Sequence, residues 1–198
     1  MAPSTSLESP GVLGPEQRRL LLGIARASIR HGLAHGRPLP VDPDALSPEL
    51  AAVRGAFVTL TRRGRLRGCV GRTRPCRPLA EDLADLAYGA AFRDSRFLPV
   101  TAEELDELEI HLSLLTVPEP VAFSSDADLM AQLTPGQDGL ILEGGGRVGV
   151  FLPSVWESLP EPMDFLGQLK AKAGLPRHRP VEGLKACRFQ TESIRETD

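Results

Sequence analysis

The sequence has few aromatic residues, no long hydrophobic run and no excess of positive charge. Only 5% of its 198 residues are aromatic, with one Trp and one Tyr, which leaves little surface for stacking the bases of a single strand. Its apolar runs are far shorter than the roughly 20 residues that cross a bilayer. The net charge is −3, whereas nucleic-acid-binding domains are usually basic. The composition therefore predicts no membrane segment and makes a nucleic-acid-binding role the least favoured.

Cysteine is also scarce, and no two cysteines have the CxxC spacing of a redox or zinc motif. The three thiols are Cys69, Cys76 and Cys187, and no signal-like apolar segment begins the chain. We therefore expect a cytoplasmic protein with free thiols. His31 and His35 are four residues apart, but no acid or thiol accompanies them at ligand spacing. We expect no metal site and no cofactor.

The length and hydrophobic content predict one domain, or one domain plus a small subdomain. Hydrophobic residues make up 41% of the chain, enough for a core and too many for a disordered protein. The first 14 residues are rich in Ser, Pro and Gly and predict a flexible segment. Residues 15–191 then form the domain, and the polar residues 192–198 predict a frayed tail.

The order of the expected elements predicts an α+β fold. Strands and helices do not alternate as regular βαβ units, which favours a mixed, largely antiparallel sheet. A glycine triplet between two expected strands favours a hairpin turn over a phosphate loop, since no helix follows it. We expect helices at 15–36, 78–91, 126–133 and 163–173, a short helix from 101, and strands at 55–60, 66–70, 110–114, 140–143, 148–152 and 185–191.

The segment Arg62–Pro118 contains the strongest candidate site. In an extended strand, alternation would place Arg65, Arg67 and Cys69 on one face and Leu66 and Val70 on the other. Gly68 and Gly71 would allow close approach by a ligand or by a neighbouring backbone. The register stays open, and a slip of one residue would move Cys69 to the other face.

The chemistry of Cys69 has two interpretations. Seven arginines fall between Arg62 and Arg77, and nearby cations stabilise a thiolate, which would make Cys69 nucleophilic. Alternatively, Cys69 is a packed structural thiol beside a solvated arginine face, because free cysteine is among the most buried residue types.

Three charged residues farther along the chain are candidates for the same site. Asp94 and Arg96 lie in a loop after a predicted helix, where they form an ion pair that orders the loop or else contact a ligand. If Arg96 met Arg67, the two guanidinium groups would suit a carboxylate or phosphate. Lys172 lies in the last turn of a helix, where the helix dipole favours a cation.

These motifs together resemble the AMMECR domain family, also called AmmeMemoRadiSam system protein A. The resemblance covers residues 14–176 approximately and implies a main sheet flanked by helices, a smaller subdomain and a cleft between them. A cysteine common in the family is replaced here by Lys170, which puts any mechanism with a second thiol there in doubt. The segments that carry the resemblance are LRGCVG at 66–71, DSRFLPVT at 94–101, LSLLT at 112–116, DGLI at 138–141 and KAGLP at 172–176.

Three functional hypotheses follow, and whether the chain is an enzyme stays open. In the first, Cys69 is catalytic in a cleft that binds a small anionic substrate, and the family implies a pathway shared with radical-SAM and Memo-like proteins. In the second, the chain is a non-catalytic module that binds a small ligand or a protein. In the third, residues 62–77 contact nucleic acid. The candidate substrate-binding residues are Arg67, Gly68, Gly71, Asp94, Arg96 and Lys172.

Overall fold

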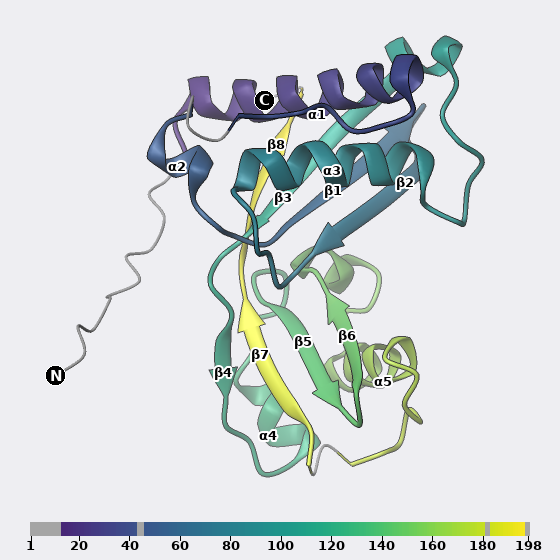
Figure 1. Ribbon diagram of the computed structural model, residues 1–198. Helices are drawn as coiled ribbons and strands as arrows, with labels where there is room; N and C mark the ends of the chain where they lie inside the picture. Colours follow the sequence, from purple (N-terminus) through teal and green to yellow (C-terminus); the bar gives the residue numbers. More distant parts are fainter. Residues whose placement is uncertain (1–12, 43–45, 181–182, 197–198) are drawn as a thin grey trace, which may run out of the picture. The chain divides into compact units, whose positions relative to one another are not determined.

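The computed structural model describes residues 13–42, 46–180 and 183–196. The chain divides into two compact units, one formed by Met1–Leu114 with Glu192–Asp198 and the other by Leu115–Thr191. Each unit has its own four-stranded sheet and its own hydrophobic core (Figure 1). The α+β class expected from the sequence is confirmed. Residues 1–12 of the predicted flexible segment lie outside the described residues.

The first unit is a sheet with strand order β2-β1-β3-β8, and two long helices lie over one of its faces (Figure 1). The first helix begins at a proline, whose fixed φ suits that position, and ends at Gly36, which has a φ of 68°. Its elements are α1 (Pro15–His35), α2 (Pro48–Ala51), β1 (Ala56–Arg62), β2 (Arg65–Arg72), α3 (Leu79–Phe92), the 3-10 helix η2 (Ala102–Glu107), β3 (Leu108–Leu115) and β8 (Thr191–Arg195).

Strand β1 alternates as a half-buried strand should. Ala56, Val58 and Leu60 are fully buried in the first core, while the residues between them are partly exposed. The alternation turns one face of the sheet toward the helices and leaves the other for polar side chains.

A β-bulge in β2 changes the alternation that we expected for the candidate site. Leu60 pairs with Gly68 and Thr61 pairs with Leu66, so Arg67 is the additional residue. Because paired residues share a face of the sheet, Leu66 lies on the same face as Cys69. The predicted alternation, with Leu66 opposite Cys69, is therefore wrong, because a strict period of two does not continue through a bulge.

The C-terminal residues differ from the predicted frayed tail. Thr191–Arg195 forms β8 in the main sheet, and Ile194 is buried in the first core. Glu196 accepts two hydrogen bonds of 2.7 Å from Arg26 on α1. Glu192 is also paired with Arg18 and Arg54. One buried apolar residue and these ion pairs therefore hold a segment whose composition is otherwise that of a chain end.

The second unit is an antiparallel sheet with strand order β4-β7-β5-β6, and two helices complete its core. The glycine triplet forms the hairpin turn expected from the sequence, with φ of 58° at Gly145 and 74° at Gly146. Its elements are β4 (Glu119–Val121), α4 (Asp126–Ala131), β5 (Gly139–Gly144), β6 (Arg147–Phe151), the 3-10 helix η3 (Pro153–Glu157), α5 (Pro162–Lys172) and β7 (Lys185–Phe189).

Two features of the second unit were not expected from the sequence. Strand β4 contains Pro120 and lies at the edge of the sheet, where a missing backbone N–H is tolerated. Trp156 is buried and stacks on Phe165 with ring centroids 3.9 Å apart. Its indole N–H donates to the Asp138 carbonyl at 2.8 Å, so the second core includes a satisfied polar group.

Gly68 is the point at which β2 comes closest to α3. A Cβ atom at this position would lie 2.1 Å from the carbonyl oxygen of Ala90, a backbone atom that cannot rotate away. We expect Gly68→Ala to lower the free energy of unfolding by about 1–3 kcal/mol or more, as measured by urea denaturation.

The matched control for Gly68→Ala is Gly23→Ala. Gly23 lies in α1, and a Cβ atom there would have no neighbour within 4 Å. This change should raise the free energy of unfolding by about 0.5–1 kcal/mol, because alanine favours a helix more than glycine does. Equal effects of the two substitutions would contradict the assigned packing.

Candidate functional site

Cys69 lies on β2, on the face of the sheet turned away from α3. Its Cα partner is Thr59 on β1, and Thr59 is in turn opposite His111 on β3. The Thr59 hydroxyl donates a hydrogen bond to the Cys69 sulfur at 3.3 Å. The thiol is partly exposed, so it is neither a fully packed core group nor a freely rotating surface group.

The backbone of Cys69 is held by the loop that follows α3. The Cys69 N–H donates to Asp94 Oδ2 at 2.9 Å. Arg96 donates from Nε and Nη2 to the two carboxylate oxygens of Asp94, at 2.9 and 2.6 Å, and from Nη2 to the Cys69 carbonyl at 3.2 Å. Asp94 and Arg96 thus form the ion pair that the sequence suggested, and the pair is attached to β2 at Cys69.

The Asp94–Arg96 pair dominates the electrostatics of this group. Hydrogen bonds from the Arg96 side chain, and then from the Cys69 and Arg96 backbone N–H groups, hold the pKa of Asp94 well below its ordinary value. The pKa of Arg96 is raised, chiefly by its hydrogen bonds to Asp94. The Asp94 side chain is 6% exposed and that of Arg96 is 55% exposed. The aspartate is therefore structural, while the arginine faces solvent next to the thiol.

Arg67 is engaged elsewhere in the first unit. It donates from Nε and Nη2 to the two oxygens of Glu104, both at 2.8 Å, and from Nη1 to the Leu98 carbonyl at 2.9 Å. The Arg67 and Glu104 side chains are only 15% and 11% exposed. Because Arg67 and Arg96 each have their own carboxylate, the structure does not show the open fork of two guanidinium groups that we expected for an anion.

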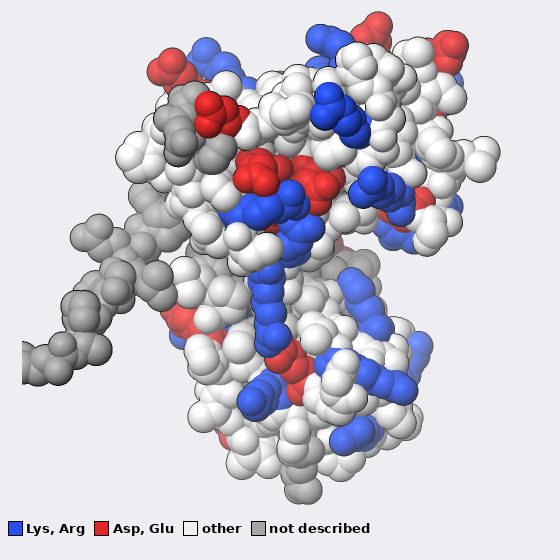
Figure 2. All heavy atoms as spheres, viewed as in Figure 1, with Lys and Arg blue, Asp and Glu red and all other residues white. Residues whose placement is uncertain are grey.

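The other arginines of residues 62–77 are largely paired as well. On the face shown in Figure 2, Lys and Arg side chains of the first unit adjoin Asp and Glu side chains. Such pairing removes the excess positive charge on which nonspecific binding to phosphates depends. The further pairs are Arg62 with Glu104 and Glu107, Arg63 with Glu107, Arg72 with Asp82 and Asp85, and Arg77 with Glu81, Asp82 and Asp85.

The two glycines of the motif are both close to protein groups. Gly68 meets the backbone of Ala90, and a Cβ atom at Gly71 would lie 2.0 Å from the ring of Phe57. Of the two alternatives for these glycines, a ligand or a neighbouring protein group, the structure supports packing against neighbouring protein atoms.

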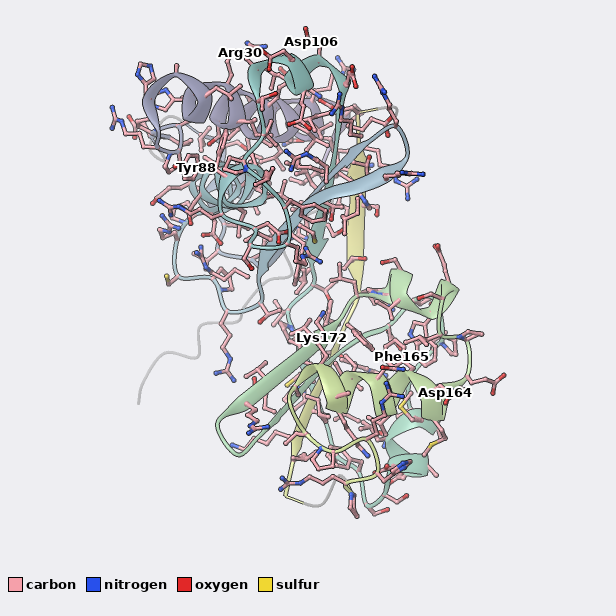
Figure 3. The ribbon with its side chains drawn as sticks, turned by 90° about the vertical axis from the view of Figure 1, so that its right-hand side faces the viewer. Arg30, Tyr88, Asp106, Asp164, Phe165 and Lys172 are labelled. Carbon is pink, nitrogen blue, oxygen red and sulfur yellow. The ribbon has the colours of Figure 1, made fainter. Side chains whose placement is uncertain are left out.

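Lys172 belongs to the second unit (Figure 3). It donates to the Val150 carbonyl at 2.8 Å and lies over the Phe151 ring, 5.1 Å from its centroid. Lys170, which replaces the cysteine common in the family, is buried in the second unit and paired with Asp126. The chain thus divides the predicted site residues between two units, and it brings together Arg67–Gly71 with Asp94 and Arg96.

Thr59 and Glu104 are residues of the site that the sequence motifs did not indicate, and His111 lies in the same row on β3. The alternation of β1 and β3 was the available signal for the row of Cys69, Thr59 and His111. The side chains of His111 and Ser193 are hydrogen-bonded, with Nε2 and Oγ 2.9 Å apart. Cys69 and His111 are two strands apart, about 10 Å between Cα atoms. A direct Cys–His hydrogen bond of about 3 Å is therefore not available from side chains that stand perpendicular to the sheet.

A small cavity lies beside His111 at the other end of this row. It has a volume of about 260 Å³ and includes Thr61, Glu109, His111 and Arg195 in its lining. Thr61 and Glu109 are opposite each other in register, two positions from Thr59 and His111 on the same strands, so they share the Cys69 face of the sheet. The cavity offers space for a ligand on that face.

The described residues hold neither a group of metal ligands nor a helix suited to a membrane. Within residues 13–42, 46–180 and 183–196, no three His, Cys, Asp or Glu side chains are grouped as metal ligands. No helix of this described part combines the length and hydropathy that a bilayer crossing requires.

The fold and site define an α+β protein of two compact units, with a partly exposed cysteine on a strand of the first unit's sheet. Residues 22–194 match the AMMECR1 family model. A protein of Methanothermobacter thermautotrophicus is 40% identical, with 83% of this chain and 85% of that protein covered. A protein of Thermofilum pendens is 38% identical, with coverages of 94% and 93%. The chain belongs to the AMMECR1 family.

A solved structure shares the same fold. The crystal structure of an uncharacterized protein from Pyrococcus horikoshii has a TM-score of 0.81 and 33% sequence identity, and the match covers 91% of this chain and 92% of that one. The resemblance to the family that the sequence motifs indicated is therefore confirmed.

The Arg67–Glu104 pair should make stability depend on acid. Hydrogen bonds from Arg67 are the largest cause that lowers the pKa of Glu104 to about 2 from its ordinary 4.5. Since the unfolded chain takes up this proton first as the pH falls, the stabilisation is present above pH 4.5 and is lost as the pH falls toward 2. Glu104→Gln should remove this part of the acid dependence and cost about 1–3 kcal/mol at neutral pH, as measured by denaturation between pH 2 and 7.

Glu119→Gln is the matched control for Glu104→Gln. Glu119 pairs with Arg188 in the second unit, but both side chains are exposed, and an exposed pair contributes about 0–1 kcal/mol. A Glu104→Gln variant that loses no more stability than Glu119→Gln would contradict a structural role for the Arg67–Glu104 pair.

Proposed function

We propose that this protein is a cytosolic enzyme, or a component of an enzyme system, in which the Cys69 thiol reacts with a small anionic substrate. The observation that carries the proposal is the position of Arg96. Its exposed guanidinium group donates to the backbone carbonyl of Cys69 at 3.2 Å. A cation in that place favours a thiolate as the attacking group and attracts an anionic substrate to it.

The rigidity of the site supports the same proposal. Asp94 is almost fully buried and accepts hydrogen bonds from both Cys69 and Arg96. The thiol and the cation therefore keep a constant relation to each other, which is what a nucleophile needs for productive geometry. Arg67 acts as a positioning residue, because its bonds to Glu104 and Leu98 attach β2 to the segment before η2.

The polar face around Cys69 supports a small substrate rather than a large one. The cavity of about 260 Å³ next to His111 is close to the lower limit for small-molecule sites. Thr59 lies between Cys69 and His111 in the sheet, and its hydroxyl group donates to the sulfur. In this proposal the hydroxyl orients the thiol toward the open side of the face.

A second candidate is a binding module without chemistry. It is favoured by the internal pairing of Arg67 and Arg96, because a guanidinium group that already has a carboxylate binds a further anion less strongly. In that case the Cys69 face holds a ligand or a partner's segment, and the thiol does not react. The proposed partners in either case are the radical-SAM and Memo-like proteins that the family resemblance implies.

A comparison of two alkylating agents tests the proposed thiol. Iodoacetate is anionic and iodoacetamide is neutral, and the two deliver groups of similar size to a thiolate. We expect the rate with iodoacetate, divided by the rate with iodoacetamide, to be about fivefold higher at Cys69 than at the exposed Cys76. A fivefold difference corresponds to an attraction of about 1 kcal/mol from one nearby charge. Mass spectrometry of the modified peptides at pH 7 measures both ratios in one sample.

Arg96→Gln should remove the preference of Cys69 for iodoacetate. Arg63→Gln is the matched control, because Arg63 is also an exposed arginine with a carboxylate partner in the first unit. A Cys69 thiol that reacts only after the protein unfolds would overturn the enzyme proposal and leave the binding module.

Cys69→Ser separates reactivity from packing. The serine hydroxyl still accepts a hydrogen bond from Thr59, and the backbone N–H still donates to Asp94. We expect the free energy of unfolding to change by less than about 1 kcal/mol, whereas thiol-dependent turnover of a small carbonyl substrate is abolished. A variant that unfolds would show instead that the thiol is a packing group.

A further inference from the structure

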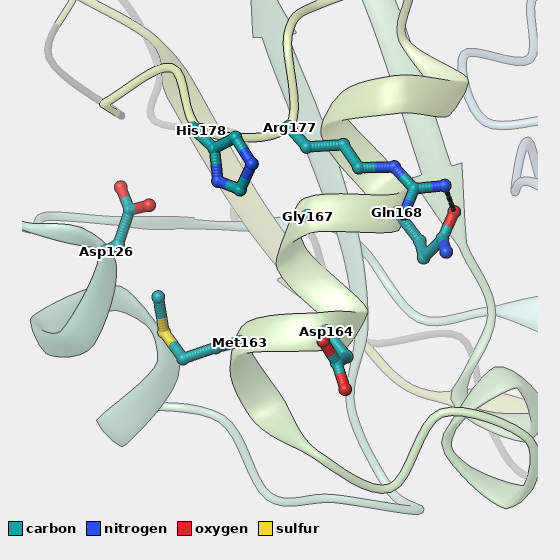
Figure 4. A pocket seen from close by; sticks show the side chains of 7 residues that line it. All are labelled: Asp126, Met163, Asp164, Gly167, Gln168, Arg177 and His178. Carbon is teal, nitrogen blue, oxygen red and sulfur yellow. Dashed lines mark hydrogen bonds between the residues drawn. The ribbon is translucent and has the colours of Figure 1, made fainter.

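The second unit contains a cavity that the proposed function does not use. Its volume is about 410 Å³, within the range of small-molecule sites. The cavity lies over α5, between the N-terminal end of α4 and the loop after α5 (Figure 4). Its lining residues are Asp126, Met163, Asp164, Gly167, Gln168, Arg177 and His178.

Side chains of both signs line this cavity. Figure 4 shows Arg177 and His178 on the loop side, with Asp126 on the same side of Gly167 in this view, and Asp164 on the opposite side of Gly167. Arg177 is oriented by a 3.0 Å hydrogen bond from its Nη2 to Gln168 Oε1. Arg177 therefore presents a positioned cation, and Asp164 presents a carboxylate across the cavity from it.

The formal charges of the site also balance. Asp126 is paired with the buried Lys170, whose side chain is 1% exposed. Asp164 and Arg177 then contribute one charge of each sign. A ligand with no net charge but with separate positive and negative groups complements this arrangement, because each group meets the opposite charge.

Gly167 is a further feature of the cavity that points to a ligand site. It lies inside α5, where glycine stabilises a helix less than alanine does. No neighbour requires a glycine there, since a Cβ atom at this position would have atoms of Arg177 as its nearest neighbours, 4.0 Å away. The missing side chain leaves the floor of the cavity open, next to the thioether of the exposed Met163.

We propose that this cavity binds a small zwitterion of amino-acid size. Asp164 receives the ammonium group, Arg177 receives the carboxylate, and the open floor at Gly167 together with Met163 accommodates the side chain. His178, on the same side as Arg177, adds a second nitrogen for the carboxylate. The site is formed entirely by residues of the second unit and does not depend on the chemistry of Cys69.

Ligand binding by the purified full-length chain tests this proposal. The probes are the twenty standard L-amino acids, screened by saturation-transfer NMR, with butyrate and butylamine as ligands of a single charge. We expect at least one amino acid to bind saturably and both single-charge probes to bind at least about tenfold more weakly. Isothermal titration calorimetry then gives the affinity of the wild type and the variants.

Three variants locate the site. Gly167→Leu should fill the cavity and abolish binding, while Asp164→Asn and Arg177→Gln should each weaken binding at least about tenfold. The matched control is Gly23→Leu, at another helical glycine with open space around it, which should bind as the wild type does. A thermal melt of each variant confirms that it is folded, and the two charge variants test the site even if Gly167→Leu does not fold.

The proposal is overturned by any of three results. The first is that no amino acid binds the wild type at millimolar concentration. The second is that binding survives unchanged in folded Gly167→Leu or in both charge variants, which places the ligand elsewhere. The third is that butyrate or butylamine binds as tightly as the amino acid, which excludes recognition of two opposite charges.

Discussion

The carboxylate of Asp94 is the contact on which the candidate site depends. It accepts a hydrogen bond from the Cys69 backbone and two from the Arg96 side chain. Strand β2 at Cys69 and the loop at residues 94–96, which begins 25 residues later in the sequence, therefore keep a constant geometry. The Asp94 side chain is almost fully buried, so removal of Arg96 would leave a buried carboxylate without its ion-pair partner. An unpaired buried charge lowers the free energy of unfolding more than the loss of an exposed ion pair does. Without Asp94, neither the loop after α3 nor the cation beside the thiol would have a defined position.

The same principle explains why so many arginines yield so little positive surface. Arg67 is bound to Glu104, and the neighbouring arginines are bound to carboxylates of α3 and η2. Each pair attaches the β1–β2 hairpin or the turn after it to another element of the first unit. These arginines therefore mainly connect elements within the unit, whereas Arg96 is exposed and donates to the backbone carbonyl of Cys69.

The second unit uses charge differently. Lys170 and Asp126 form a pair at a cavity wall, whereas Arg177 and Asp164 line the cavity itself. The cavity remains open because Gly167 has no side chain to fill it. A glycine inside a helix reduces helix stability, and the same missing side chain leaves the cavity open.

The sequence by itself determined the class of fold, the family and the position of most elements, because hydrophobic periodicity and turn residues act locally. It also identified Asp94 and Arg96 as a pair. Only the tertiary structure decided which face Cys69 occupies, since a bulge at Arg67 breaks the alternation. The partners of Arg67, the strand at Thr191–Arg195 and the cavity at Gly167 likewise depend on residues distant in sequence. Such contacts arise from chain packing, which no local pattern encodes.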